Sequence, residues 1–351
     1  MNIVTDGRAS AFLYVSTLGG RAKKRMLIFR VLSRAEACLS IAEPWVDLWG
    51  ETDDPNPFMH PSWQLAWMGT IGSRRTIKTL CAFEGTGLRA VWPLWKGVGG
   101  LWRPCGQGVS DYLHPLGMGT DELLAGVQRD AGWTGSIGAP YIPGESLEVS
   151  LGLTSQLALD GDPEAFWGAV SKNLKRDARQ AATAGVTAVW SKEGSALEEL
   201  MEAHQAHWRR KKMPGSFWKP AVREFHLAAL RRGAPIWVLR AEGDGGHLGS
   251  LYLIETPARV CFYQACRVPS EERLSIGTFL VCEAIKWAQE SGKKSFDFLR
   301  GEEAYKRRWK PDLETPLGCF QWQGSYGTGL QLAVERQKML AEAALKKRFE
   351  K

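Results

Sequence analysis

The segment Phe296-Asp-Phe-Leu-Arg-Gly-Glu-Glu-Ala-Tyr-Lys-Arg-Arg-Trp309 places an acidic strand, a glycine and a charged stretch directly after one another. Its pattern predicts a strand over Ser295–Leu299 and then a short helix. Asp297 would lie in that strand among apolar neighbours, where an unpaired carboxylate is very costly to bury. We therefore expect Asp297 either to pair with Arg300 or Lys306 or to take part in chemistry.

The residues on either side of this segment predict a regular succession of strands and helices. A long basic helix is expected from Asp162 to Gly185. The order β, α, α, β, β, β, α, β, α, β follows, with the ten elements expected at Val186–Ser191, Ser195–Lys212, Pro220–Arg232, Ile236–Ala241, Leu248–Ile254, Val260–Val268, Ile276–Glu290, Ser295–Leu299, Glu302–Trp309 and Gly318–Trp322. This order predicts an α/β fold with mixed sheets flanked by helices.

The first half of the chain predicts a second mixed α/β unit with a meander of strands. After a strand over Leu27–Leu32, short strands separated by glycines are expected at Thr76–Phe83, Leu88–Trp95 and Gly100–Pro104. The stretch Ala131–Gly152 is rich in glycine and proline, so we expect it to be irregular.

Composition and charge divide the chain into four parts. The 351 residues are 44% hydrophobic and 24% charged, which excludes a disordered tail, a collagen-like fibre and a coiled coil. The net charge of +7 comprises +4 in residues 1–25, −5 in 26–160, +5 in 161–328 and +3 in 329–351. We predict a disordered basic extension, an acidic domain, a basic domain for something anionic, and a basic amphipathic helix with Val334, Ala341 and Leu345 on its apolar side.

Cysteine usage and hydropathy indicate the compartment. The seven cysteines include no Cys-x-x-Cys pair, which favours reduced thiols. No apolar run approaches the roughly 20 residues of a membrane span. We expect a cytoplasmic protein, and the basic ends favour peripheral attachment to an anionic membrane surface on the inner face of the cytoplasmic membrane.

Two segments resemble a known family. Residues 296–309 match the pattern D-x-x-x-G-x-x-x-Y-K-x-x-W of the CelD/BcsL-like acyltransferases, and Pro57–Trp67 (PFMHPSWQLAW) resembles their N-terminal segment. This branch of the GNAT superfamily is related to the FemAB peptidyltransferases. The resemblance covers about residues 50 to 325 and implies two tandem GNAT-like domains. The first (26–160) would be degenerate, and the second (161–328) would carry the chemistry.

The resemblance also implies acyl-CoA as co-substrate and no permanently bound cofactor. The CoA pyrophosphate would meet a loop and helix N-terminus formed by Arg273, Ser275, Gly277 and Thr278, because such an end presents free N–H donors. The loop departs from the usual [R/Q]-x-x-G-x-[G/A] pattern, so aminoacyl-tRNA, the donor of FemAB relatives, stays open. A plain helix capped by Ser275 is the third interpretation.

Acyl transfer to an amine needs a base for the amine and a proton for the leaving thiolate. His204 and Asp297 are the candidate catalytic bases, although a core-edge histidine and a structural ion pair explain them equally well. Tyr305 is the candidate proton donor. His204 and His207 have no third ligand at a matching spacing, so we expect no metal.

Basic and aromatic side chains are candidates for binding phosphates or the acceptor. Lys175 and Arg179 lie on one basic helical stripe, which either holds phosphates or faces solvent. Arg300 and Lys306 are further candidates from the 296–309 segment. Trp208 belongs to a surplus among 16 tryptophans that would line an acyl groove, stack on sugars or lie at a bilayer interface.

The acceptor is the least determined element. Basic ends and surplus tryptophans favour a lipid amine, and the family resemblance includes bacterial N-acylation of sphingoid bases to ceramide-type lipids. Acylation of sugar groups in exopolysaccharide or cellulose synthesis, FemAB-like transfer from aminoacyl-tRNA, and a non-catalytic scaffold of an envelope-polymer complex remain alternatives. Sequence-specific DNA binding has no support, because the sequence contains no zinc-finger spacing.

Overall fold

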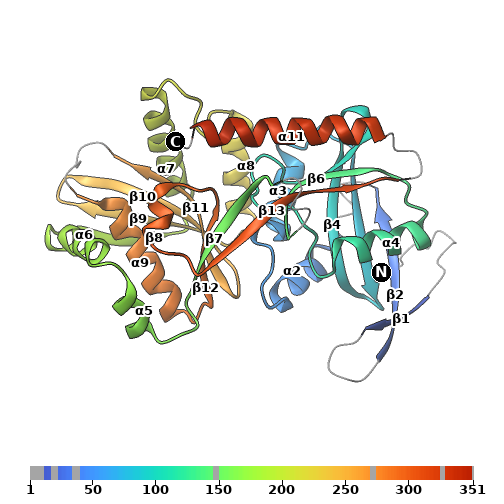
Figure 1. Ribbon diagram of the computed structural model, residues 1–351, viewed down its shortest axis with the longest axis horizontal. Coiled ribbons are helices and arrows are strands. Elements are labelled where there is room, and N and C mark those ends of the chain that lie inside the picture. The colour runs from blue at the N-terminus through green and yellow to red at the C-terminus, as the bar shows by residue number, and fades with distance from the viewer. Residues whose placement is uncertain are drawn as a thin grey trace.

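The computed structural model describes residues 12–16, 23–33, 40–144, 150–268, 274–324 and 329–349. Within these residues thirteen strands form one mixed sheet, flanked by helices on both faces (Figure 1). From one edge to the other the strands are β1 (Phe12–Ser16), β2 (Lys23–Leu32), β3 (Ile77–Glu84), β4 (Gly87–Lys96), β5 (Trp102–Pro104), β6 (Ile137–Pro143), β13 (Leu313–Trp322), β7 (Gly152–Ala158), β12 (Ser295–Arg300), β11 (Arg259–Arg267), β10 (Gly246–Glu255), β9 (Ile236–Gly243) and β8 (Thr187–Ser191). The predicted α/β class is confirmed.

The helices are distributed over both halves of the sheet. They are α2 (Ala42–Glu51), α3 (Pro61–Gly69), α4 (Thr120–Ala131), α5 (Pro163–Ala169), α6 (Lys172–Thr183), α7 (Gly194–Arg210), α8 (Pro220–Arg231), α9 (Ile276–Glu290), α10 (Ala304–Arg307) and α11 (Gly329–Phe349), with a 3-10 turn at Pro57–Met59. The order from β8 to β13 is β, α, α, β, β, β, α, β, α, β, as predicted.

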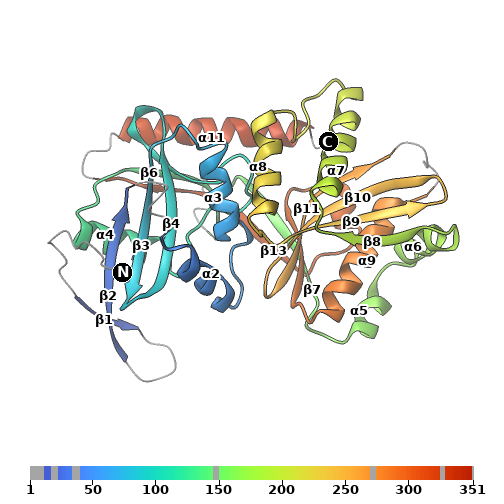
Figure 2. The same ribbon diagram turned by 180° about the vertical axis from the view of Figure 1, so that it is seen from behind.

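The C-terminal half of the sheet is covered on both faces, which explains its strongly apolar strands. Side chains alternate between the two sides: Tyr252 and Ile254 join the core under α7 and α8, whereas Leu251 and Leu253 join the core under α9. The first of these cores continues into the N-terminal half. There α3 packs beside α8 (Figure 2), and Ser62 Oγ donates to the carbonyl of Arg232 at 2.7 Å.

Strand β13 joins the two halves of the sheet. It pairs antiparallel with β6 through Gly318↔Ile142 and Trp322↔Ile137, and with β7 through Leu313↔Gln156. In Figure 1 it runs from the C-terminal half to the N-terminal half alongside α11. The two halves therefore share a hydrogen-bonded ladder made by a late segment of the chain.

Three sequence-based expectations for local structure were wrong. The stretch 131–152 contains β6 and the start of β7, although Pro140 and Gly138 within β6 lower its apparent strand propensity. The long helix expected over 162–185 is two helices, because the Ser171 Oγ accepts the N–H of Leu174 and caps a new helix. Residues 12–16 and 23–27 pair as strands, so the described parts of the extension predicted to be disordered lie in the sheet.

The C-terminal helix packs through a face other than the one expected. Leu332, Glu335 and Met339 are buried against β6 and β13, whereas Val334 is 61% exposed. Ala341 is also exposed, and the side chain of Leu345 lies outside the described residues. The packed face includes a carboxylate, because Glu335 Oε1 accepts the Arg103 Nε proton at 2.7 Å and a second hydrogen bond joins the same two groups. Sequence periodicity does not identify a charged residue as part of a buried face.

Candidate functional site

The site begins where strands β11 and β12 part. The two strands are parallel and pair only through Arg259↔Ser295, Val260↔Phe296 and Cys261↔Asp297. Beyond this point each keeps its other neighbour, β10 for β11 and β7 for β12. From Phe262 in β11 and Phe298 in β12 onward, the two strands therefore no longer pair with each other.

The 296–309 segment bends β12 away from β11. Asp297 Oδ1 accepts the backbone N–H of Leu299 at 2.7 Å, and Leu299 has a left-handed φ of 58°. The Lys306 ammonium donates to the carbonyls of Leu299 and Arg300 at 3.3 and 3.1 Å. Opposite charges from one motif therefore hold the two sides of the same bend.

Gly301 completes this bend. Its φ is 133°, and a Cβ atom there would lie 2.3 Å from a carboxylate oxygen of Glu303. A residue with a side chain would be strained by this backbone conformation, and the Glu303 carboxylate would have to shift. Glu303 in turn forms an ion pair with Lys306 at 2.8 Å. The glycine of the motif is thus explained by backbone geometry.

Strand β11 departs from regular pairing at the same level. Its register against β10 shifts between Leu253↔Phe262 and Tyr252↔Gln264, so Tyr263 is an extra, bulged residue. Bulges re-aim side chains and are frequent beside active sites. The Tyr263 hydroxyl reaches the loop of the N-terminal half and donates to the Val109 carbonyl at 3.0 Å.

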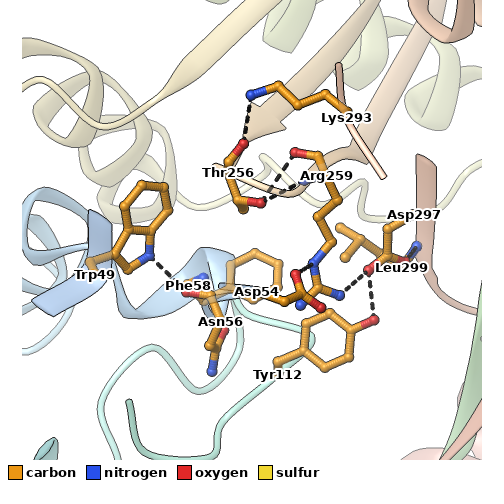
Figure 3. A network of polar contacts seen from close by, with 10 residues as sticks. All are labelled: Trp49, Asp54, Asn56, Phe58, Tyr112, Thr256, Arg259, Lys293, Asp297 and Leu299. Atoms are coloured by element: carbon orange, nitrogen blue, oxygen red, sulfur yellow. Dashed lines mark hydrogen bonds and ion pairs between the residues drawn. The ribbon is translucent and has the colours of Figure 1, made fainter. Parts of the chain in front are cut away.

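A buried polar network holds the root of the opening (Figure 3). Asp297 is fully buried, and its Oδ2 accepts from Arg259 Nη1 at 3.0 Å and from the Tyr112 hydroxyl at 2.8 Å. Arg259 Nε also lies 2.8 Å from Asp54 Oδ1. The backbone N–H of Arg259 donates to Thr256 Oγ1 at 2.9 Å. The network joins the N-terminal half to the paired part of β11 and β12.

This network corrects the expected pairing of Asp297. The partners are Arg259 and Tyr112, not Arg300 or Lys306, because the bend turns those two side chains elsewhere. Burial raises the pKa of Asp297, against the opposing effects of Arg259 and the Tyr112 hydrogen bond. Burial and the Asp297 charge raise the pKa of Tyr112. The Asp297 carboxylate is therefore engaged by structural contacts at the root of the opening.

The opening leads into a cavity of about 980 Å³ that lies between the two halves. Its walls come from β11, β12, the loop before Tyr112, the α7–α8 connection, α3 and α11. Nine Trp, Tyr and Phe side chains contribute to them: Trp67, Trp95, Tyr141, Trp208, Trp218, Phe262, Tyr263, Phe298 and Tyr305. A cavity of this size with both aromatic and polar walls suits a small-molecule ligand.

The polar groups of the cavity are largely paired. Arg300 Nε contacts Asp111 Oδ1 at 3.0 Å, and its guanidinium lies 3.9 Å from the centre of the Tyr141 ring. Lys306 is held by carbonyls and Glu303, so it is poorly placed to bind phosphate as a free charge. Tyr305 is 38% exposed, and desolvation together with the Glu303 charge raises the pKa of its phenol. Such a phenol keeps its proton at neutral pH.

Gln264 occupies the free edge of β11. Its Oε1 accepts the backbone N–H of Ala265 at 3.2 Å, and its Nε2 donates to Ser216 Oγ at 3.0 Å. A side-chain amide thus satisfies a backbone donor beside the opening. A ligand with amide groups can take the same donor once Gln264 turns away.

His204 lies outside the cavity lining. It is 4% exposed, and its Nε2 accepts the Trp208 indole N–H at 3.0 Å. Burial and then His207 lower the pKa of His204 to about 4, so it is neutral at pH 7. Trp208 does line the cavity. The structure therefore favours His204 as a residue that orients Trp208 rather than as the base.

The predicted phosphate-binding residues are only partly brought together. Arg273 lies outside the described residues. Ser275 precedes α9 without a side-chain cap bond, contrary to the capped-helix interpretation, and Gly277 and Thr278 lie in the first turn with unpaired helix donors. Lys175 and Arg179 lie on α6, which packs against α9 away from the cavity. The Lys175 ammonium donates to the Trp167 carbonyl at 2.8 Å, and Arg179 faces solvent.

Sequence reasoning missed several functional candidates. Tyr112, Arg259 and Gln264 lie outside the recognised segments, and their roles depend on partners far away in the chain. His226 lines the cavity with Nδ1 3.1 Å from the Tyr252 hydroxyl, and burial lowers its pKa to about 3. In the sequence, His226 follows Val222 by one turn of an amphipathic helix, and nothing in that pattern predicts a position at the cavity.

Two classes of feature are absent from the part of the chain described. No group of three or more His, Cys, Asp or Glu side chains is arranged to hold a metal ion there. None of the described helices combines the length and apolar character required to cross a bilayer.

A parallel strand pair that opens beside a helix N-terminus defines the class of fold, and comparisons with known proteins agree. Residues 168–307 match the family model described as acetyltransferase (GNAT) domain. Residues 168–307 therefore resemble a GNAT acetyltransferase domain, and the mixed α/β sheet of the chain agrees with that class of fold. No curated protein sequence matches it significantly.

Solved structures extend the likeness over most of the chain. FemX is 9% identical with a TM-score of 0.62, over 80% of this chain and 96% of that one. L-PGS from Bacillus licheniformis is 12% identical with a TM-score of 0.55, over 89% and 97%. The C-terminal domain of a protein described as a lysylphosphatidylglycerol synthetase from Agrobacterium fabrum is 16% identical with a TM-score of 0.54, over 85% and 94%. At these identities the likeness concerns the fold.

Proposed function

We propose that the protein is an acyl-CoA-dependent N-acyltransferase of the CelD/BcsL-like type, with its active site between β11 and β12. The observation that carries this proposal is the opening of this strand pair into an aromatic cavity. An extended acyl-pantetheine arm has amide groups that suit free strand edges, and the Ala265 N–H would serve as a donor there once the Gln264 side chain that now accepts it turns away. The first turn of α9 follows β11 and favours the pyrophosphate.

The proposed reaction joins an amine to the thioester carbonyl. The amine attacks the carbonyl carbon, the C–N bond forms, and the C–S bond breaks as the tetrahedral intermediate collapses. Tyr305 is a candidate to protonate the leaving thiolate because its phenol lines the cavity and carries a proton at neutral pH, and the proton taken up by the carboxylate base then returns through water to the phenolate. The proton of the amine passes through water to Asp111 or Glu303, the carboxylates that line the cavity. Trp208 and Arg300 would contact the acceptor.

The favoured acceptor is a lipid amine such as a sphingoid base. The aromatic walls suit an alkyl chain, and two proteins of similar fold carry names that refer to a lipid product or its abbreviation. Acylation of polysaccharide sugars is the first alternative. Aminoacyl-tRNA as donor is the second, since FemX shares the fold. A non-catalytic scaffold of an envelope-polymer complex is the last.

Calorimetric titration tests the donor. We expect acetyl-CoA, palmitoyl-CoA or both to bind more tightly than free CoA, because the acyl group reaches the cavity. Absence of binding by all three would leave the tRNA and scaffold alternatives.

Tyr305→Phe should lower kcat by about 100-fold with little change in the KM for the donor, in line with loss of a general acid. Asp111→Asn and Glu303→Gln then distinguish the two candidate bases.

Lipid profiling of a deletion strain identifies the acceptor, and an unchanged lipid profile with altered polysaccharide would contradict a lipid amine.

A further inference from the structure

The connection from α7 to α8 carries a concentrated group of exposed cations. Arg209 and Arg210 end α7, Lys211 and Lys212 follow, and Lys219 precedes α8. Trp218 lies beside them and is 57% exposed. These six residues are called the α7–α8 patch below.

The positive charge of the patch is not compensated. None of its five cations has a carboxylate within 4.0 Å among the residues that the structure describes. The neighbouring cations of α8 differ: Arg223 lies 3.3 Å from Glu202, and Arg231 pairs with Glu224. The patch thus presents a local positive field, whereas the body of α8 is neutralised.

Apolar side chains connect the patch to the cavity. Trp218, Lys219 and the adjacent Met213 and Pro214 all contribute to the cavity wall. The Lys219 ammonium lies 5.1 Å from the centre of the Trp218 ring. An exposed tryptophan among lysines suits a membrane interface, where the indole lies at headgroup level and the cations contact anionic headgroups.

We propose that the α7–α8 patch docks the protein on an anionic lipid bilayer, so that the cavity opens toward the membrane. The delivery of a lipid amine rests on the proposed function, but the docking does not. The compact cluster suits headgroups better than RNA, which requires cations along an extended track. Residues 26–160 carry a net charge of −5, which would repel a long polyanion.

Vesicle co-sedimentation of the full chain tests the docking. Wild-type protein should bind vesicles of phosphatidylcholine with phosphatidylglycerol and bind phosphatidylcholine alone much more weakly. The variant Arg210→Gln/Lys211→Gln/Lys212→Gln removes three patch cations that do not line the cavity. We expect its affinity for the anionic vesicles to fall by roughly 100-fold, because each surface cation contributes about a factor of five. Trp218→Ser should cause a further, several-fold loss.

A matched control removes the same charge elsewhere. Lys172→Gln/Lys294→Gln/Lys310→Gln changes three exposed lysines of other segments and should retain binding to within about threefold, because a distant cation is screened over roughly 10 Å. Equal binding by the patch variant and the control would overturn the proposal and point to the basic ends of the chain. Tighter binding of polyuridylic acid than of vesicles, lost in the patch variant, would overturn it in favour of RNA.

The two proposals fail separately. Calorimetry with palmitoyl-CoA in the absence of lipid reports the donor site alone, and the patch variant should bind it as wild type does. If wild-type protein binds anionic vesicles through the patch but binds no acyl-CoA, docking stands and the acyl-CoA proposal falls. If acyl-CoA binds and vesicles do not, the reverse holds.

Discussion

The β5–α4–β6 and β11–α9–β12 crossovers each join two parallel strands through one helix, yet only the second leaves an opening. In the N-terminal crossover, the side chains of Leu101 and Trp102 at β5 are buried. Helix α11 covers β6, and a Cβ at Gly138 would lie 3.4 Å from Glu335 and 3.5 Å from Met339. The two crossovers share their topology, but α11 packs over β6 in the first, whereas β11 and β12 part beside a cavity in the second.

The largest effect is expected from breaking the ion pair that holds α11 over the filled crossover. Arg103→Ala or Glu335→Ala leaves a buried charge unpaired and should lower the free energy of unfolding by about 3–5 kcal/mol in urea titrations. The double variant Arg103→Leu/Glu335→Leu should recover most of that loss. Equal losses in single and double variants would show that the pair does not hold the helix.

Gly301→Ala tests the bend after β12 that separates this strand from β11 in the open β11–α9–β12 crossover. The left-handed backbone and the contact with Glu303 should cost about 1–3 kcal/mol of stability and reduce turnover. Gly168→Ala in α5 is the control, because a Cβ there meets no atom within 4 Å, no unusual φ is required and the residue does not line the cavity. A Gly301 variant as stable and active as the control would contradict this role.

Ala265→Phe places a large side chain in the opening of the β11–α9–β12 crossover, which makes it more like the covered β5–α4–β6 crossover. Ala265 is partly exposed at the cavity, so the larger ring should enter the space proposed for the donor. We expect acyl-CoA affinity to fall by at least about tenfold, or 1.4 kcal/mol, with little loss of stability. Calorimetry measures the first quantity and thermal unfolding the second. Unchanged affinity would place the donor elsewhere.

The smallest effect is a pH dependence of the filled crossover. Burial opposes ionisation of Glu335, but the Arg103 hydrogen bonds and charge outweigh it and lower its pKa. A carboxyl whose folded pKa is depressed stabilises the fold above its unfolded pKa, and this stabilisation is lost as the pH falls through the folded pKa. Urea titrations at decreasing pH should therefore show a steeper loss for wild type than for Glu335→Gln. Parallel curves would contradict the assignment.

Much of the C-terminal half could be predicted from the sequence. Its strands and helices have clear apolar periods between glycines, so the order from β8 to β13 follows from local pattern. Strand β6 was missed because Gly138, Pro140 and Pro143 have low strand propensity. The strand forms because its backbone pairs with β13. Local propensity gives no information about a partner strand that lies far along the chain.

The site shows the same limit. The 296–309 segment could be recognised as special, and Asp297 as a buried carboxylate. Its partners could not be named, because Arg259 and Tyr112 approach from another strand and from the other half. His204 has the residue type and helical face of a catalytic base, and Trp208 follows on the same face at i+4. The hydrogen bond that engages His204 Nε2 is the part that only the structure shows.

The position of β13 has a consequence for how the chain folds. During synthesis β6 and β7 emerge long before the strand that lies between them, so their facing edges stay unpaired until residues 313–322 are made. Unpaired edges invite wrong pairing, and such distant contacts slow folding. The growing chain therefore has a late, single step in which its two halves become one sheet, and this step is where a holding chaperone would matter most.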